Sequence, residues 1–142
     1  MNTQSLHHRD VVNRHGRVVI LVEDDAGLRS ALERVLRASG FEAQAYADAE
    51  AALADRSVEW ADCLVIDLNL PAISGLDLLE HLRGRGVMAP AVVISAQDQD
   101  RIRQEVERRS AARFLPKPFL GSALVRVLDD VIGSAEPSST PR

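Results

Sequence analysis

The chain has 142 residues, and its 17 Lys plus Arg against 21 Asp plus Glu give a formal net charge of −4. That length suits one domain, and 46% hydrophobic with 27% charged residues excludes a chain that is disordered throughout. A single cysteine excludes a disulfide framework, and the mild acidity disfavours a protein that coats nucleic acid.

The two ends of the chain carry no pattern of a folded core. Residues 1–16 are polar and lack the apolar run of a signal peptide, and residues 134–142 are mostly Ser, Thr and Pro. We therefore expect a flexible N-terminal extension over 1–16, one domain over 17–133 and a disordered tail over 134–142. No segment reaches the ~18–20 apolar residues of a membrane span, so we expect a cytoplasmic protein without membrane contacts.

Five short segments predict β-strands. Three are near-continuous apolar runs, typical of strands buried on both faces of a parallel sheet. The second alternates weakly and the fifth is short, and both are bounded like strands. In chain order, the predicted strands are Val18–Val22, Phe41–Tyr46, Cys63–Ile66, Ala91–Ser95 and Arg113–Pro116.

The stretches between these strands carry apolar residues at helical spacing, which indicates amphipathic helices packed on a sheet. Ser74 with Asp77 predicts a helix N-terminus, whereas Gly40 and Gly133 predict helix ends. The apolar stripes are, in chain order, Leu28, Leu32, Val35 and Leu36, then Leu76, Leu79 and Leu82, and then Leu120, Leu124, Val127, Leu128, Val131 and Ile132.

The alternation of strand and helix, five times over, predicts an α/β domain with a parallel sheet and right-handed crossovers. In open sheets of this kind, function gathers at the carboxyl ends of the strands, near the switch in strand order. The residues that follow each predicted strand are therefore the place to look for chemistry.

Three consecutive acids, Glu23, Asp24 and Asp25, follow the first predicted strand. Such a cluster repels itself and favours a bound cation. Acids also complement the positive end of a helix dipole, so a plain helix N-terminus is an equal alternative.

Asp67, Ser95 and Lys117 follow the third, fourth and fifth predicted strands. Each alone has an ordinary explanation, namely an Asx turn, a helix cap and a solvated charge. Together they suit phosphoryl transfer, with Asp67 as a nucleophile that forms an acyl phosphate. Asp24 and Asp67 offer the carboxylates that Mg²⁺ prefers, and Lys117 with Ser95 can hold the phosphoryl oxygens.

With these residues in view, the sequence resembles the receiver domain of two-component response regulators. The motifs that carry the resemblance are ILVEDD at 20–25, VIDLNLPAISG at 65–75, VVISA at 92–96 and FLPKPF at 114–119, within roughly residues 17–133. The resemblance implies a three-layer flavodoxin-like (βα)5 fold with a parallel five-stranded sheet in the order 2-1-3-4-5. It also implies a phosphoacceptor of a two-component system that is not an enzyme in the ordinary sense.

The resemblance implies a Mg²⁺ site next to the phosphoacceptor. Asp67 matches the phosphoacceptor itself. Asp24 matches a direct Mg²⁺ ligand, Glu23 a partner that acts through water, and Asn69 the position whose backbone carbonyl binds the metal. Asp25 is an extra acid beside this pair.

The resemblance also implies roles around the phosphoryl group. Ser95 stands where the family has Thr or Ser, and Lys117 matches the family's lysine, whose bond to Pro118 is expected to be cis. Phe114 matches the switch aromatic, with a plain core residue as the equal alternative.

The partners implied are a sensor histidine kinase or histidine phosphotransfer protein as donor, and a downstream protein or a second copy as target. The target is expected to bind the face of the fourth helix, fifth strand and fifth helix. This chain itself is expected to bind no nucleic acid. The Arg-rich residues 99–113 are either a solvated helix face or part of that surface.

Three alternatives stay open. One is a truncated receiver of a longer DNA-binding response regulator, in place of a stand-alone receiver. Another is an aspartyl-nucleophile phosphohydrolase, which needs a second Asp two residues after Asp67, where this chain has Asn69. The third is a binding module that keeps the fold without using phosphate.

Overall fold

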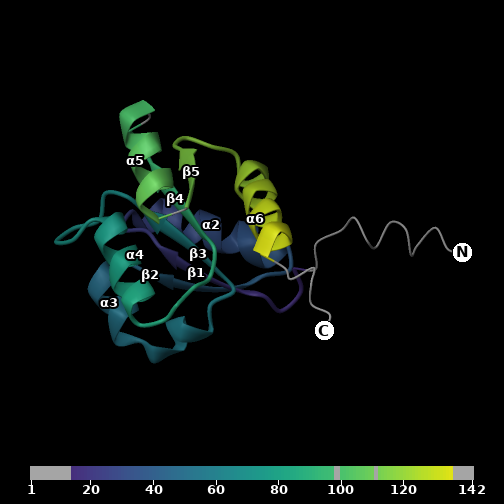
Figure 1. Ribbon diagram of the computed structural model, residues 1–142. Helices are drawn as coiled ribbons and strands as arrows, with labels where there is room; N and C mark the ends of the chain where they lie inside the picture. The colour runs from purple at the N-terminus through teal and green to yellow at the C-terminus, as the bar shows by residue number, and fades with distance from the viewer. Residues whose placement is uncertain (1–13, 98–99, 111, 136–142) are drawn as a thin grey trace, which may run out of the picture.

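The computed structural model describes residues 14–97, 100–110 and 112–135 (Figure 1). Residues 1–13 of the expected extension and 136–142 of the expected tail lie outside the described residues. Strands and helices alternate over the described ranges as the sequence predicts. The elements are β1 (Val18–Val22), α2 (Ala26–Ala38), β2 (Glu42–Tyr46), α3 (Ala49–Ala54), the 3-10 helix η1 (Arg56–Trp60), β3 (Cys63–Asp67), α4 (Gly75–Gly84), β4 (Ala91–Ser95), α5 (Asp100–Ser110), β5 (Arg113–Pro116) and α6 (Gly121–Ala135).

The five strands form one parallel sheet in the order β2-β1-β3-β4-β5, which confirms the predicted flavodoxin-like fold. The chain reverses its direction of travel across the sheet after β2, so the switch point lies between β1 and β3. Asp67 of β3 pairs with Ile94 of β4, and Ser95 pairs with Pro116 of β5. The carboxyl ends of β3, β4 and β5 therefore lie at one edge of the sheet.

Alternate residues of the central strands face two separate helix layers. Ile20 and Val22 of β1 pack with residues of α3, α4 and α5, whereas Val19 and Leu21 pack with residues of α2 and α6. All four are fully buried, and burying a Val, Leu or Ile side chain contributes about 1.5–3 kcal/mol each. Coverage on both faces is the reason why these strands have near-continuous apolar sequences.

The helix ends follow local rules at three of four positions. The Asp25 side chain accepts from the Leu28 N–H at 3.0 Å and begins α2, and the Ser74 hydroxyl accepts from the Asp77 N–H at 3.1 Å and begins α4. Gly40, with φ +100°, follows the end of α2 as predicted.

The prediction that Gly133 ends the last helix is wrong, because α6 continues to Ala135. A glycine inside a helix costs only about 1 kcal/mol relative to alanine. Val131 and Ile132 bury their side chains against the sheet just before it, and this packing holds the turn in helical form.

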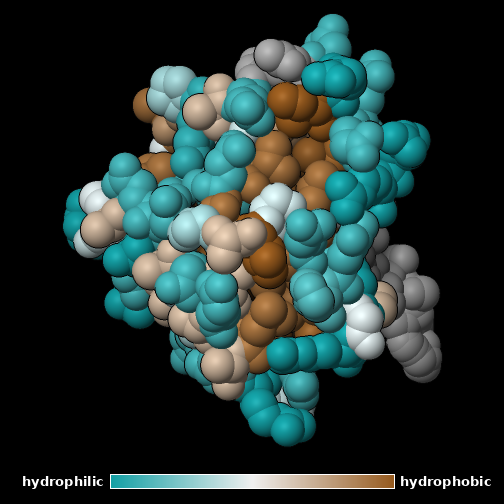
Figure 2. All heavy atoms as spheres, turned by 90° about the vertical axis from the view of Figure 1, so that its left-hand side faces the viewer, coloured by the Kyte–Doolittle hydropathy of each residue, from teal (hydrophilic) through white to brown (hydrophobic). Residues whose placement is uncertain are grey.

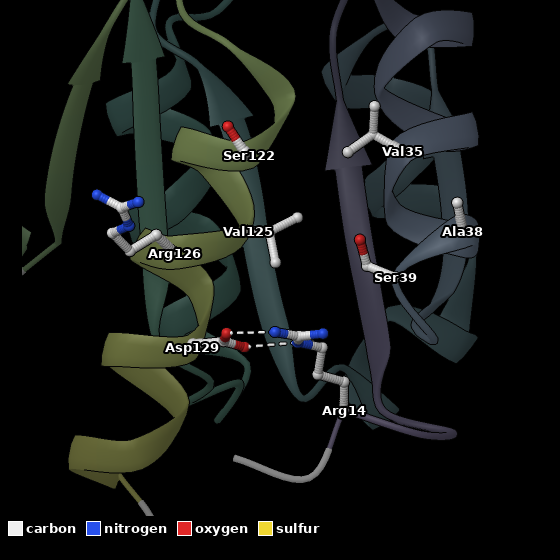
Figure 3. Close-up of a pocket in the computed structure, with 8 residues that line it drawn as sticks. All are labelled: Arg14, Val35, Ala38, Ser39, Ser122, Val125, Arg126 and Asp129. Carbon is white, nitrogen blue, oxygen red and sulfur yellow. Dashed lines mark hydrogen bonds and ion pairs between the residues drawn. The ribbon is translucent and has the colours of Figure 1, made fainter. Parts of the chain in front are cut away.

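The described chain reaches back to Arg14, which is tied to α6. The Arg14 guanidinium donates from Nε to Asp129 Oδ1 at 2.9 Å and from Nη2 to Asp129 Oδ2 at 2.7 Å. Figure 3 shows this pair at one end of a groove of about 510 Å³ between α2 and α6, whose apolar walls include Val35 and Val125. Over the described ranges, no helix has the length and apolarity needed to cross a membrane.

Candidate phosphoryl and metal site

Three carboxylates meet at the carboxyl edge of the sheet. Glu23 and Asp24 come directly after β1, and Asp67 is the last residue of β3. One oxygen from each lies within 4.8 Å of the others. The two strands are neighbours on either side of the switch point, so the fold brings together acids that are far apart in the sequence.

Glu23 is fully buried, and only one of its two carboxylate oxygens accepts a hydrogen bond within the described part of the chain. Its Oε2 accepts from the Asp25 N–H at 3.0 Å, but Oε1 has no hydrogen-bond partner among the described residues. Lys117 Nζ approaches that oxygen at 3.1 Å as an ion pair, without the angles of a hydrogen bond. Burial raises the pKa of Glu23, as does the Asp67 charge, against the lowering effects of the Asp25 N–H and Lys117. A buried carboxylate oxygen without a donor is suited to a water or a cation.

Asp67 is 3% exposed and held on both oxygens. Its Oδ1 accepts from the Asn69 N–H at 3.0 Å, and its Oδ2 lies 3.3 Å from Lys117 Nζ. Gly75 packs directly against the Asp67 backbone, and it donates its N–H to the carbonyl of the next residue, Leu68, at 2.8 Å. A Cβ on Gly75 would overlap the Asp67 carbonyl oxygen, so only glycine fits here.

Lys117 bridges the two buried acids from the end of β5. The backbone N–H of Lys117 donates to the Ser95 carbonyl at 2.7 Å, and the peptide bond from Lys117 to Pro118 is cis. Burial lowers the pKa of Lys117, but the ion pairs with Glu23 and Asp67 outweigh burial and leave that pKa raised. The side chain is therefore a fixed cation next to Asp67 Oδ2.

Ser95 presents a buried hydroxyl beside the acids. Its Oγ accepts from the Gln97 N–H at 2.9 Å and donates to Asn69 Oδ1 at 3.4 Å. Asn69 thus contacts Asp67 through its backbone N–H and Ser95 through its amide side chain, and the metal-binding role of its carbonyl stays a prediction. An amide cannot act as the carboxylic acid that a phosphohydrolase of the alternative class needs at this position.

The two interpretations of the acidic run apply to different residues. Asp24 is exposed and belongs to the carboxylate cluster with Glu23. Asp25 turns its Oδ1 to the Leu28 N–H and is the N-cap of α2. Glu23 and Asp24 therefore face the candidate cation site, while Asp25 caps the N-terminus of α2.

Phe114 is 6% exposed in β5 and packs in the layer of α3, α4 and α5. The Arg103 guanidinium lies 4.9 Å from the centre of its ring, a cation–π contact between α5 and β5. The core position of Phe114 is thus a structural fact, and its part in switching stays a prediction.

The Arg-rich α5 is held by ion pairs to nearby acids. Arg109 Nη2 lies 2.6 Å from Glu80 of α4, and Arg108 lies 2.6 Å from Glu105 of the same helix. Figure 2 faces the side of α3, α4 and α5, where hydrophilic residues border an apolar stripe. A hollow of about 230 Å³ on α4 and α5 is lined in part by Leu76, Ile102 and Val106.

Two residues near the site were missed from the sequence. Arg29 of α2 donates from Nη1 to the Glu23 carbonyl at 2.9 Å and to the Asp24 carbonyl at 3.4 Å. Gly75, the last residue of the VIDLNLPAISG motif, fits closely against the Asp67 backbone. The signal for Arg29 was its position one helical turn after Asp25, which directs its side chain back to the acidic run.

Comparisons with known proteins find similarity over most of the chain. The family model described as "Response regulator receiver domain" matches residues 19–129. Nodulation protein W of Bradyrhizobium diazoefficiens is 31% identical over 119 residues, which are 84% of this chain and 51% of the relative. The chain spans about half the length of the curated relatives that it matches.

Two solved structures illustrate the similarity in fold. The response regulator StyR superimposes with a TM-score of 0.74 at 32% identity, covering 84% of this chain and 60% of that one. The receiver domain of the Francisella response regulator 1452 superimposes with a TM-score of 0.77 at 23% identity, covering 84% of this chain and 98% of that one. At that identity the second comparison supports the fold alone.

Proposed function

Because this chain belongs to the family of response regulator receiver domains, we propose that it accepts a phosphoryl group on Asp67, with Mg²⁺, and thereby switches the binding of a partner. Members of this family act in two-component signalling and are not classical enzymes. The observation that carries the proposal is the position of Lys117 between two buried carboxylates, Glu23 and Asp67, at the carboxyl edge of the sheet.

The donor is a sensor histidine kinase or a histidine phosphotransfer protein. A carboxylate oxygen of Asp67 attacks the phosphorus of the donor's phosphohistidine, and a new P–O bond forms as the P–N bond breaks. The electron pair of the broken bond stays on the imidazole nitrogen. The product on this chain is an acyl phosphate at Asp67.

The residues at the site fit Mg²⁺. Mg²⁺ favours oxygen ligands from one or two carboxylates, with waters and phosphate oxygens completing an octahedron. Asp24 and Asp67 would supply the carboxylates, Asn69 would supply its backbone carbonyl, and the Glu23 oxygen without a hydrogen bond would hold a bound water. When bound, the ion offsets the negative charge of the acids and of the phosphoryl oxygens.

Lys117 and Ser95 hold the phosphoryl group after transfer. The Lys117 ammonium is already 3.3 Å from Asp67 Oδ2, so a phosphoryl oxygen on Asp67 meets a cation at hydrogen-bond range. The Ser95 hydroxyl gives up its weak 3.4 Å bond to Asn69 and donates to another phosphoryl oxygen. This exchange pulls on the loop after β4, and Phe114 responds through packing because it has no hydroxyl.

The output surface is the face of α5, β5 and α6, which binds a downstream protein or a second copy of the chain. Arg103 belongs to this surface and touches Phe114, so a change in the packing of Phe114 is transmitted to it. Binding of the target then shifts the equilibrium between two states of α5 and β5.

The test uses beryllofluoride, which stands in for the phosphoryl group on a carboxylate. With Mg²⁺ present, we expect amide resonances near Asp67, Ser95 and Lys117 to shift in wild-type protein and to stay in place in Asp67→Asn. The matched control is Asp25→Asn, because Asn keeps the helix cap and Asp25 lies outside the carboxylate cluster; it should respond as wild type does. An unchanged wild-type spectrum would overturn the proposal.

A further inference from the structure

One residue, Arg29, occupies all three carbonyl oxygens of the acidic run that follows β1. Its backbone N–H donates to the Asp25 carbonyl at 2.8 Å as part of the first turn of α2. Its Nη1 donates to the Glu23 carbonyl at 2.9 Å and to the Asp24 carbonyl at 3.4 Å. These contacts fix the backbone of the loop from the side of α2.

The conformation of the loop backbone sets the directions in which the Glu23 and Asp24 side chains leave it. Asp25 uses its N–H to hold Glu23 Oε2 and its side chain to cap Leu28, so neither group can support Asp24. The carboxylates of Glu23, Asp24 and Asp67 lie close together, and Lys117 pairs with Glu23 and Asp67 but not with Asp24. The repulsion that remains between Asp24 and its neighbours favours a splayed loop when no metal cation is bound. The Arg29 guanidinium opposes that repulsion by holding the carbonyls rather than the carboxylates.

We propose that Arg29 is a positioning residue that preorganises Glu23 and Asp24 for a cation that demands strict geometry, and so favours Mg²⁺ over Ca²⁺. The inference rests on the proposed metal site. Mg²⁺ requires a near-ideal octahedron, whereas Ca²⁺ accepts six to eight ligands in flexible arrangements. A loop that is free to splay therefore weakens Mg²⁺ binding more than Ca²⁺ binding.

Simple electrostatics predicts the opposite sign, which makes the proposal easy to test. If Arg29 acted only as a nearby positive charge, its removal would tighten the binding of both cations. If it acts by holding the carbonyls, its removal loosens the loop and weakens Mg²⁺. A lysine keeps the charge but is a point donor on a flexible stem, so it cannot reproduce the guanidinium contacts.

The experiment measures Mg²⁺ and Ca²⁺ affinity by calorimetric titration of wild type, Arg29→Gln and Arg29→Lys. The matched control is Arg34→Gln, which removes an exposed arginine of the same helix whose guanidinium donates to Ser30 at 3.4 Å. We expect the Mg²⁺ dissociation constant of Arg29→Gln to rise about tenfold, the value for loss of one charge-assisted hydrogen bond. Its Ca²⁺ constant should change much less, Arg29→Lys should be intermediate for Mg²⁺, and Arg34→Gln should match wild type.

A second readout needs no metal. In the metal-free protein, hydrogen exchange at the Asp25 amide should be faster in Arg29→Gln than in Arg34→Gln, because the bond of that amide to Glu23 Oε2 depends on the loop. Unchanged or tighter Mg²⁺ binding in Arg29→Gln, or equal weakening of both cations, would overturn the proposal. If wild type itself binds no Mg²⁺, the proposed metal site fails instead.

Discussion

Replacing Gly75 by alanine tests how the phosphoacceptor strand is anchored. A Cβ at Gly75 would overlap the Asp67 carbonyl oxygen and lie 2.9 Å from both the Asp67 carbonyl carbon and the Leu68 Cα, where ordinary contact begins at 3.4 Å. All of these neighbours are backbone atoms, so no side-chain rotation relieves the overlap. Either the end of β3 or the first turn of α4 must move.

The cost of this movement has two parts. Overpacking of this kind destabilises by about 1–3 kcal/mol, and loss of the Gly75 N–H bond to the Leu68 carbonyl adds about 1 kcal/mol. The better helix propensity of alanine recovers less than about 1 kcal/mol. We expect Gly75→Ala to lower the free energy of unfolding by about 2–3 kcal/mol.

Urea denaturation followed by circular dichroism measures this loss. The matched control is Gly84→Ala in the same helix, where a Cβ meets nothing within 4 Å, so stability should be unchanged or slightly higher. Because the Asp67 backbone moves, Gly75→Ala should also bind Mg²⁺ more weakly than Gly84→Ala. Equal stability and equal Mg²⁺ affinity of the two variants would refute the reasoning.

Three further predictions concern parts of the fold outside the site. Ala72 has φ +73°, so Ala72→Gly should raise the free energy of unfolding by about 1 kcal/mol in urea denaturation, and a loss would contradict the strain. Burial raises the pKa of Cys63 to about 12, so a thiol reagent should label it only as the protein unfolds; rapid labelling of the folded protein would contradict this. The Tyr46 hydroxyl and Ser57 lower the pKa of Asp55, so this group stabilises the fold above its unfolded pKa and loses that effect as the pH falls through the lowered value. The stability difference between wild type and Tyr46→Phe should shrink over that acid range, and a difference that is constant with pH would count against the contact.

The sequence predicts the sheet well because its signal is local. Strands β1, β3 and β4 are short apolar runs, and coverage by helices on both faces is the physical reason for those runs. The candidate site follows from the same reasoning, since parallel strands deliver Asp67, Ser95 and Lys117 to one edge. For each of these three residues, the flanking sequence was enough to predict its position at the end of a strand.

The features that the sequence did not predict depend on contacts between parts of the chain that local patterns do not encode, or on packing that outweighs helix propensity. Gly75 matters because α4 lies against the end of β3, and no local pattern encodes that distance. Arg29 matters because its side chain runs back along the loop, where a surface arginine is the ordinary expectation. Gly133 has the sequence of a helix end, but burial of Ile132 keeps α6 intact beyond it.

Covalent transfer of a phosphoryl group to Asp67 is the most direct test of the proposed function. Wild-type protein is incubated with a small acyl phosphate, with and without Mg²⁺, and its intact mass and peptide masses are measured. We expect the mass of one phosphoryl group to appear on the peptide that contains Asp67, only with Mg²⁺, and to be absent in Asp67→Asn. No mass gain in wild type, or the same gain in Asp67→Asn, would contradict the assignment of Asp67 as the phosphoacceptor.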